Sequence, residues 1–303
     1  MSDLGKVIGV GHCTVDIICP FGSFPALDRK TEIDRLEIQG GGPAANAMAA
    51  LAKLGVRTAI VSRMGTDIFG QFARRDLLRR DIECTHLFMD RETRSPLSVV
   101  IACKEDATRT IVVYKGENRE VEPAWLEPEW IATGAYLHID GHQLPASLKL
   151  AKEFKQTGRP IMFDAGSWRD GTEELLSLAD TVIASRDFAS RLSSDPKEAL
   201  VRLAGYGAKF CAITLGADGC IGRDADGAIV ESRGFAVEAR DTTGAGDVFH
   251  GAYIYAELSG YEFVERLEFA NAAAAMKCRE LGARGGLPAA DEVREFIERS
   301  GRS

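Results

Sequence analysis

The chain has 303 residues, of which 45% are hydrophobic, and this is enough to bury a large core. Its formal net charge of −8 argues against a broad nucleic-acid-binding or acidic-membrane surface, because such surfaces need clusters of Lys and Arg. The seven scattered cysteines form no Cys-x-x-Cys pair and no run approaches the roughly 18 apolar residues of a membrane span, so we expect a cytoplasmic protein without disulfides, zinc, nucleic-acid partners or membrane partners.

The first elements alternate between a buried core and an insertion. Residues 6–11 (KVIGVG) are a short apolar run bounded by glycine, which predicts a buried strand. Residues 14–19 and 32–38 are rich in β-branched side chains around the turn-forming PFGSFPALD, which predicts two paired strands. Residues 43–54 (PAANAMAALAKL) begin with proline, are rich in alanine and stop at a glycine, which predicts a helix.

The middle of the chain repeats this mixture. Residues 57–65 predict a strand and residues 67–80 an amphipathic helix, and two strand-like runs follow at 95–103 and 108–116. We expect these last two runs to pair with the first insertion. The predicted organisation is one domain over residues 1–303, with a small β-sheet lid at about 12–40 and 93–116 and a core at about 1–11, 41–92 and 117–303.

The second half is more regular. Short apolar runs at AYLHID, PIMFDAG, TVIAS and FCAITLG are separated by helical stretches. Alternation of strand and helix predicts a mainly parallel sheet covered by helices on both faces, and therefore an α/β fold. Three further helices are expected at about 247–259, 262–280 and 289–300.

Two glycine-rich loops lie in the front part of the chain. GVGHCT at 9–14 begins like a dinucleotide-binding loop, but a strand-like run follows it where that motif needs a helix. Asp16 just beyond the first strand lies where open α/β sheets bind ligands, although a plain acidic residue at a strand edge is the simpler reading. Gly40, Gly41 and Gly42 precede the helix that carries Asn46, so a ligand could approach the backbone closely and meet an amide that both donates and accepts.

The third glycine-rich stretch, DTTGAGDVFHGAY at 241–253, runs into a predicted helix. Gly244, Ala245 and Gly246 would turn free N–H groups toward one point, and the helix dipole adds partial positive charge there. Asp247 is expected to stay ionised in that field and to accept a proton from a hydroxyl that attacks a phosphoryl group. The alternative is an acidic first-turn residue that stabilises the helix by about 0.3 to 1 kcal/mol.

Taken together, GGGPAANAMAALAKLG near the front and DTTGAGDVFHGAY near the back resemble the two signatures of the ribokinase-like, PfkB-type carbohydrate kinases. The resemblance covers nearly the whole chain, including the divided lid. It implies a three-layer α/β/α core with a β-sheet lid, ATP as phosphoryl donor with Mg²⁺, a sugar as acceptor, and a monovalent cation such as K⁺.

The resemblance also implies roles for individual positions. Asp247 matches the catalytic base and the stretch 244–246 the anion hole, while a second set matches the acceptor site: Asp16, Gly41, Gly42 and Asn46. Matches to the nucleotide site form a third set: Ser185, Thr214, Gly216, Gly219, Asn271 and Ala275. Small residues that allow close helix packing are the alternative reading for Asn271 and Ala275.

The chain departs from the family pattern in one place. Many members carry Asn-x-x-Glu after the strand written TVIAS here, in a motif linked to magnesium and phosphate, but this chain has Ser185 and Phe188. Phe188 cannot replace a carboxylate; either Asp187 takes that role or contacts bridged by water suffice, so no residue is assigned to the metal. DTTGAGDVFHGA together with the later MKC and GGLP resembles the ketohexokinase and sulfofructose kinase branch, which points to a ketose acceptor.

Histidines offer a competing metal-site reading. His138 and His142 have the spacing of a helical metal pair, but the run AYLHID predicts a strand, which separates them. We expect Asp140 to His142 to form a strand-end rim that faces the acceptor, and His250 to serve in packing.

The resulting prediction is a kinase that phosphorylates a hydroxymethyl group of a sugar, such as a ketose or sugar acid. A nucleoside kinase of the same superfamily and a nonenzymatic sugar or nucleotide sensor are the alternatives. The lid strands have edges that could pair with a second chain, so a homodimer through the lid is also expected.

Overall fold

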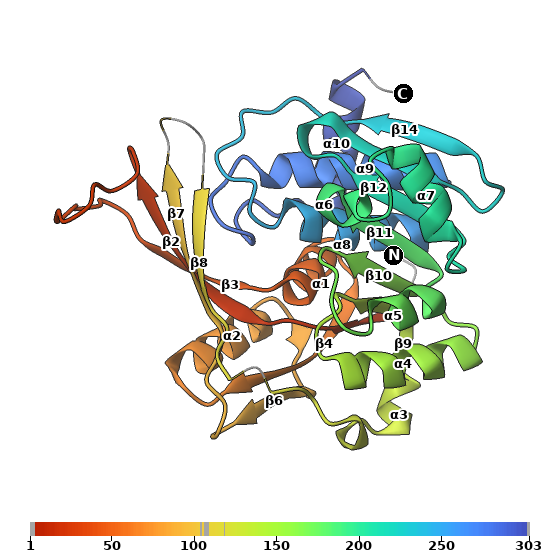
Figure 1. Ribbon diagram of the computed structural model, residues 1–303, viewed down its shortest axis with the longest axis horizontal. Coiled ribbons are helices and arrows are strands. Elements are labelled where there is room, and N and C mark those ends of the chain that lie inside the picture. Colours follow the sequence, from red (N-terminus) through yellow and green to blue (C-terminus); the bar gives the residue numbers. More distant parts are fainter. Residues whose placement is uncertain (1–3, 104, 106–108, 118, 302–303) are drawn as a thin grey trace.

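Most of the apolar runs align in one large sheet. The computed structural model describes residues 4–103, 105, 109–117 and 119–301. The sheet has ten strands in the order β14-β13-β12-β11-β10-β9-β1-β4-β5, with β6 paired to β4 (Figure 1). Its strands are β1 Lys6–Val10, β4 Arg57–Gly65, β5 Ile82–Glu83, β6 Leu87–Asp90, β9 Gly134–Ile139, β10 Ile161–Ala165, β11 Thr181–Ser185, β12 Phe210–Thr214, β13 Gly219–Arg223 and β14 Ile229–Arg233.

The centre of this sheet is parallel, as predicted, but one edge is not. Strands β1, β4, β9, β10, β11 and β12 pair in parallel, whereas β13 and β14 add an antiparallel edge that the sequence analysis did not predict. Their sequences, GCIGR and IVESR, contain few apolar residues, and β14 is largely exposed. An edge strand that faces water on one side does not produce the continuous apolar run used to recognise buried strands.

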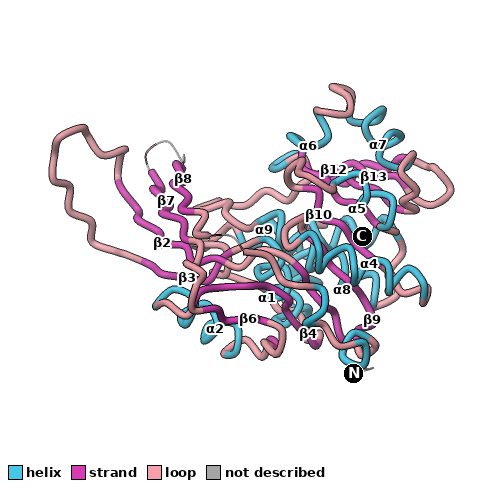
Figure 2. Tube along the Cα trace, turned by 60° about the horizontal axis from the view of Figure 1, so that its bottom comes forward, coloured by secondary structure: helices cyan, strands magenta, loops and turns pink. Residues whose placement is uncertain are grey.

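Helices cover both faces, which gives the three layers of the predicted fold (Figure 2). Val7 and Ile8 are neighbours on β1, yet they belong to separate hydrophobic cores, because side chains alternate between the faces of a strand. The helices of one face are α1 Pro43–Lys53, α2 Ile68–Leu78, α8 Ala245–Leu258, α9 Phe263–Lys277 and α10 Ala290–Arg299. The other face carries α3 Pro128–Ile131, α4 Leu144–Gln156, α5 Thr172–Leu178, α6 Arg186–Ser190 and α7 Pro196–Ala204.

The α1–α8 contact brings the two glycine-rich motifs together. Helix α1 begins with proline and ends with Leu54 as its C-cap, and both bounds agree with the predicted helix. Its alanine-rich surface lets α8 approach closely: a Cβ added to Gly251 would lie 2.7 Å from the carbonyl oxygen of Ala47. Asn46 on α1 and the first turn of α8 therefore face each other.

A second, smaller sheet stands away from the core (Figures 1 and 2). Its order is β3-β2-β7-β8, formed by β2 Thr14–Phe21, β3 Glu37–Gly41, β7 Leu97–Cys103 and β8 Arg109–Tyr114. The predicted strand at 32–38 was wrong in its bounds, because residues 30–36 form a loop and the pairing begins at Glu37 and continues into the glycines. Residues 104 and 106–108, within the predicted lid range, lie outside the described residues.

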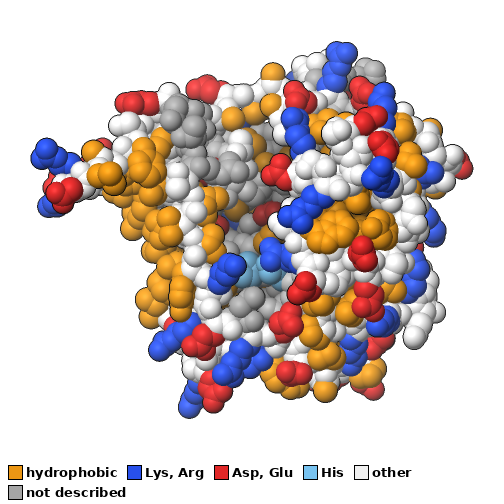
Figure 3. Space-filling view, in the orientation of Figure 1, with side chains coloured by type: hydrophobic (Ala, Val, Ile, Leu, Met, Phe, Trp, Pro, Cys, Tyr) orange, Lys and Arg blue, Asp and Glu red, His pale blue; other side chains and the backbone are white. Residues whose placement is uncertain are grey.

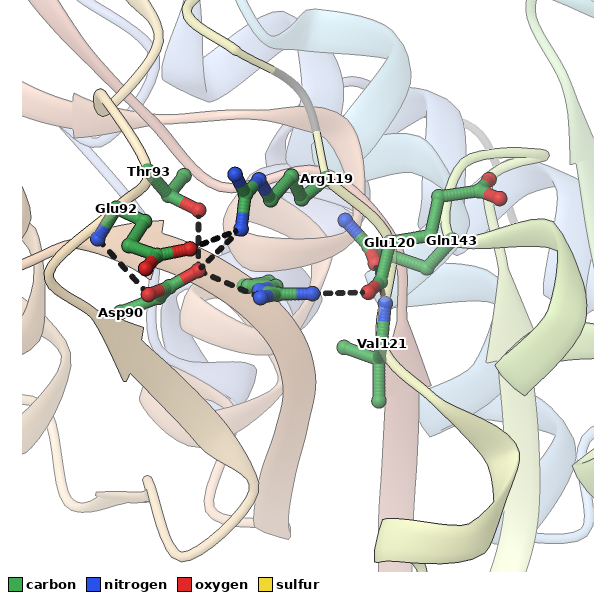
Figure 4. Close-up of polar contacts among 8 residues, drawn as sticks. Asp90, Glu92, Thr93, Arg119, Glu120, Val121 and Gln143 are labelled. Carbon is green, nitrogen blue, oxygen red and sulfur yellow. Dashed lines mark hydrogen bonds and ion pairs between the residues drawn. The ribbon is translucent and has the colours of Figure 1, made fainter.

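Polar contacts fasten the smaller sheet to the core where the chain crosses between them (Figure 4). Asp90, at the end of β6, accepts hydrogen bonds from the Thr93 hydroxyl at 2.7 Å and from Arg63 at 2.5 Å, and Arg119 pairs with Glu92 at 2.8 Å. These bonds join the segment that leaves for β7 to the segment that returns from β8. Within the described residues, no helix is long and apolar enough to cross a membrane.

We predict that Gly251→Val lowers the free energy of unfolding by about 1 to 3 kcal/mol, because the new side chain must push α8 away from α1. Thermal or urea denaturation measures the loss. Lys152→Val, at an exposed helical position, is the control and should stay within about 0.5 kcal/mol of the parent. Equal stability of Gly251→Val and the parent would show that the two helices can separate without cost.

Candidate functional site: a helix N-terminus between two binding regions

The third glycine motif forms the N-terminus of α8. Gly244 is the N-cap with φ 75°, a left-handed conformation that favours glycine, and a Cβ there would also lie 2.6 Å from the Cβ of Ala283. Gly246 follows in the first turn, and a Cβ added there would meet no atom within 4 Å. The N–H of Ala245 donates to the carbonyl of Thr242 at 3.2 Å, so one of the three predicted donors is already engaged.

Asp247 lies in the first turn of α8 and is half-buried. The Asn46 amide nitrogen donates to its Oδ2 at 2.7 Å. Burial and the nearby Asp164 carboxyl raise the pKa of Asp247 to about 7, although the Asn46 hydrogen bond acts in the opposite direction. Asp247 was expected to stay ionised at neutral pH, whereas a pKa of about 7 leaves only about half of it ionised there, because burial outweighs the helix dipole. A carboxyl with this pKa exchanges protons near neutrality.

The four predicted acceptor-site residues come together beside Asp247. A Cβ on Gly41 would lie 2.3 Å from an oxygen of Asp16, and a Cβ on Gly42 would lie 2.2 Å from the His12 carbonyl oxygen. The glycines are thus required so that the loop can pass close to the end of β1 and to Asp16 on β2. Burial raises the pKa of Asp16, while a hydrogen bond with Ser98 lowers it.

Asp140 was predicted to face the open rim of the site. It is buried instead and supports this region. Its carboxylate accepts from the backbone N–H groups of His12 at 2.8 Å, Ala44 at 3.0 Å and His142 at 2.9 Å. Burial alone would raise the pKa of Asp140, but the His142 ring and these N–H groups bring it below its usual range. Asp140 therefore fixes the first turn of α1 against the ends of β1 and β9.

The imidazole rings of His12 and His142 form the rim instead. They stack with their centroids 4.6 Å apart, and Arg169 in the loop after β10 approaches them. Burial, together with His142 and Arg169, lowers the pKa of His12 to about 4. Figure 3 shows a hollow between the smaller sheet and the core in which a histidine surface lies among Lys and Arg side chains.

A cavity of about 460 Å³ lies on the other side of Asp247. Five of the six predicted nucleotide-site residues line it: Thr214, Gly216, Gly219, Asn271 and Ala275. Ala245 and Gly246 also line it, so the cavity ends at the N-terminus of α8. The remaining lining is mostly apolar and small, with Phe235, Ala236, Val237, Phe249 and Ala274 among its members. A flat, largely apolar ring with an anionic tail fits such a space.

Ser185 is the exception. It pairs with Thr214 across β11 and β12, but it is not part of the cavity lining. Its hydroxyl accepts from the Phe188 N–H at 3.1 Å as the N-cap of α6 and donates to the Gly166 carbonyl at 3.1 Å. The position after β11 thus serves to begin a helix, as serine commonly does.

The same turn offers little to a metal ion. Phe188 is buried and stacks on Trp168, with ring centroids 5.0 Å apart, whereas the Asp187 side chain is exposed. The alternative that Asp187 replaces the missing carboxylate stays a prediction.

A different group with metal-ligating side chains lies beneath α8. His138, Asp164 and His250 are buried, and their possible ligand atoms lie within 4.8 Å of one another. Burial lowers the pKa of both histidines, that of His138 to about 3, and burial together with Asp140 raises the pKa of Asp164 to about 8. Burial thus favours the uncharged form of each of these three side chains.

Arg284 is a residue of the site that the sequence analysis missed, as it missed His12 and Arg169 at the rim. It lies in the loop between α9 and α10, and its buried guanidinium reaches Asn46, Gly41 and Asp76. An arginine in a glycine-rich turn (GARGGLP) has no spacing that distinguishes it from a solvated charge.

The comparisons with known proteins agree with this arrangement. The model of the pfkB family carbohydrate kinase matches residues 5–290. The chain is 27% identical to the ATP-dependent ribose-1-phosphate kinase of Halopiger xanaduensis (96% of this chain, 98% of that one) and 25% identical to a nucleoside kinase of Methanothermobacter thermautotrophicus (99% and 98%). It is also 27% identical to the ribokinase of Bacillus subtilis (95% and 98%). A crystal structure of a protein from Agrobacterium tumefaciens superposes with a TM-score of 0.93 at 26% identity, covering 99% of both chains.

We predict that Asp164→Asn removes a pH-dependent loss of stability. A carboxyl whose folded-state pKa is raised favours the folded state only while protonated, so stability falls as the pH rises from about 4 toward 8. The stability of Asp164→Asn relative to the parent should therefore increase between pH 5 and 8 in thermal melts. Asp170→Asn, at an exposed carboxylate, is the control and should follow the parent. Parallel pH curves for Asp164→Asn and the parent would show that Asp164 is ionised in the folded protein.

Proposed function

Because the chain belongs to the pfkB family of carbohydrate kinases, we propose that it transfers the γ-phosphoryl group of ATP to a hydroxymethyl group of a sugar, with Asp247 as the base. The observation that carries this proposal is the position of Asp247 between two regions. On one side Asn46 holds its carboxylate at 2.7 Å, and on the other side Ala245 and Gly246 form the end of the 460 Å³ cavity. A hydroxyl and a phosphate that enter from opposite sides would meet there.

The first step is proton removal from the acceptor. Asp247 in its ionised form accepts the hydroxyl proton as the oxygen attacks, and a pKa of about 7 suits a base at neutral pH. Asp16 and Asn46 would orient the sugar through hydrogen bonds to its hydroxyl groups.

The second requirement is stabilisation of the negative charge on the transferred group. The adenosine part of ATP would occupy the cavity, and its phosphates would extend toward the N–H groups of Gly244 and Gly246. These donors and the dipole of α8 favour anions at this position. The smaller sheet would act as a lid that excludes water, which otherwise competes with the sugar as acceptor.

Magnesium would supply further neutralisation of the phosphate charge. The described residues do not offer the carboxylate of the Asn-x-x-Glu motif in the turn after β11, so we assign no protein ligand and propose that the ion is bound chiefly by phosphate and water, as Mg²⁺ often is. A requirement for a monovalent cation such as K⁺ stays a prediction from the resemblance, and activity measured with K⁺ and then with tetramethylammonium tests it.

The rim favours acceptors that carry an anionic substituent. Arg169 and the stacked rings of His12 and His142 lie at the ends of β1, β9 and β10, where open α/β sheets bind their ligands. The named relatives act on ribose 1-phosphate, ribose or nucleosides and do not single out the ketohexokinase and sulfofructose kinase branch. A ketose or sugar-acid acceptor therefore stays a prediction, and sugar phosphates join it as candidates.

A nucleoside kinase is the second candidate, since one relative at 25% identity over nearly the whole chain has that name. Greater turnover with adenosine, guanosine or inosine than with any sugar would favour it. A nonenzymatic sensor is less well supported, because a sensor has no need of a base beside an anion-binding helix.

We also propose a homodimer through the lid. The edge strand β8 exposes Val112 and Val113, which point to opposite faces of the sheet, and Tyr114 is exposed as well. Exposed apolar edge strands are ready to pair with another chain. Light scattering after size exclusion should give about twice the chain mass of 32.8 kDa, and Val112→Lys should shift the protein to the monomer; a monomeric parent would contradict the proposal.

We predict that Asp247→Asn folds normally and binds ATP but loses activity by about 10³-fold or more, because the amide cannot accept the proton. The measurement is a coupled ADP-release assay with ATP and Mg²⁺ against ketoses, aldoses, sugar acids, sulfosugars, sugar phosphates and nucleosides. Glu257→Gln, at a carboxyl on the same helix but distant from the cavity, controls for a general effect of amide substitution. Near-normal turnover of folded Asp247→Asn would exclude Asp247 as the base.

A further inference from the structure

We propose that Arg284 is a positioning residue that acts on Asp247 through Asn46. This inference rests on the proposed role of Asp247 as the base. It assigns a function to a residue that lies in neither of the two family signatures. Arg284 makes no direct contact with Asp247. It sets the orientation of the side chain that does.

The guanidinium of Arg284 is fixed by three partners on three different elements. Its Nε donates to the Asn46 Oδ1 at 2.8 Å on α1, its Nη1 pairs with Asp76 on α2, and its Nη2 donates to the Gly41 carbonyl at 3.2 Å at the end of β3. Only 1% of the side chain is exposed. A buried planar guanidinium with each of its three nitrogens engaged cannot rotate freely.

This arrangement determines which end of the Asn46 amide faces Asp247. A guanidinium only donates, so the Asn46 atom that faces it must be the oxygen. The Asn46 nitrogen is then directed to the opposite side, where it donates to the Asp247 Oδ2 at 2.7 Å. Without Arg284 the amide could turn over and present its oxygen to the carboxylate, which would replace an attraction with a repulsion.

The backbone around Arg284 leaves room for it. A Cβ on Gly40 would lie 2.0 Å from the Arg284 Nη1, so the first glycine of the triplet is needed for the arginine as well as for the loop. The main-chain N–H of Arg284 donates to Gln39 Oε1 at 3.2 Å, which ties the same loop to β3. The third glycine motif is linked too, because the neighbouring Gly282 N–H donates to Asp241 at 2.7 Å.

The consequence for Asp247 is a change in its proton affinity. Asp164 from β10 and Asp140 after β9 face it and favour its neutral form, while Asn46 from α1 and His250 from its own helix favour the ionised form. A hydrogen bond donated to the ionised form lowers a carboxyl pKa. Loss of the correctly oriented Asn46 amide should therefore raise the pKa of Asp247, and a larger share of the enzyme would hold an inactive, protonated base near pH 6.5.

The test is the pH dependence of kcat/KM for Arg284→Met, measured from pH 5.5 to 9 with the best acceptor of the panel. We expect the acidic limb to move upward by about 0.5 to 1 pH unit, so that activity falls about 3- to 10-fold at pH 6.5 and less than 2-fold at pH 8.5. Arg284→Lys keeps a positive charge but lacks the planar guanidinium with its several donors. The acidic limb of this variant should therefore move in the same direction by a smaller amount.

A double-mutant cycle with Asn46→Ala separates the proposed route from a direct charge effect. If Arg284 acts through Asn46, adding Arg284→Met to Asn46→Ala should not move the acidic limb further. A second displacement of equal size in the double mutant would contradict action through Asn46.

Arg266→Met is the matched control, since Arg266 forms a half-buried ion pair with Glu257 at 2.9 Å away from the site. It should lower the melting temperature without moving the acidic limb. A uniform loss of activity across the pH range in folded Arg284→Met and Arg284→Lys would reduce Arg284 to a structural role. Full activity of Asp247→Asn would instead show that Asp247 is not the base. Failure of the proposed function can therefore be distinguished from failure of the role proposed for Arg284.

Discussion

The hydrogen bond from Asn46 to Asp247 is the contact on which the whole site depends. It joins the first turn of α1, which follows the acceptor loop, to the first turn of α8, which ends the cavity. Such a short bond between two helices requires that their backbones approach closely, and the alanines of α1 and Gly251 of α8 make this possible. The large sheet beneath them holds both helices on one face, so the fold provides a rigid support for a single polar contact.

An ionised carboxylate beside a bound phosphate is electrostatically unfavourable, since each negative charge raises the energy of the other, whereas the N-terminus of α8 favours either one. In the proposed mechanism, a pKa of about 7 would let Asp247 be neutral while the phosphate binds and ionised when a proton has to be removed. The buried Asp164 carboxyl helps to raise the pKa of Asp247, and its own pKa is raised to about 8. The carboxyl groups in this region thus titrate as a group whose members influence one another.

The sequence was sufficient to predict the parts of the protein that follow local rules. The helix at 43–54 and the parallel central strands were expected from periodicity and capping. The five cavity residues were expected from the family resemblance alone; they line one cavity, and their role in binding a nucleotide stays a prediction. Ser185 caps α6 and does not line this cavity; its predicted nucleotide contact stays a prediction, because a helix cap and a ligand contact use the same hydroxyl. Arg284 was not recognised and Asp140 was given another role, because both residues act through contacts with residues up to 245 positions away. Long-range polar contacts leave no periodic signal in a sequence.

The bridge through Arg284 also limits how such an enzyme can change over evolutionary time. Gly40, Asn46 and Asp76 share one arginine, so replacement of any of them alone disturbs the others, and new acceptor preferences are hard to obtain by altering the glycine loop. The side chains of His12, His142 and Arg169 take no part in this bridge, although the two histidine rings stack on each other. Directed evolution toward other sugars should accumulate its first substitutions at these three positions and leave the arginine bridge intact.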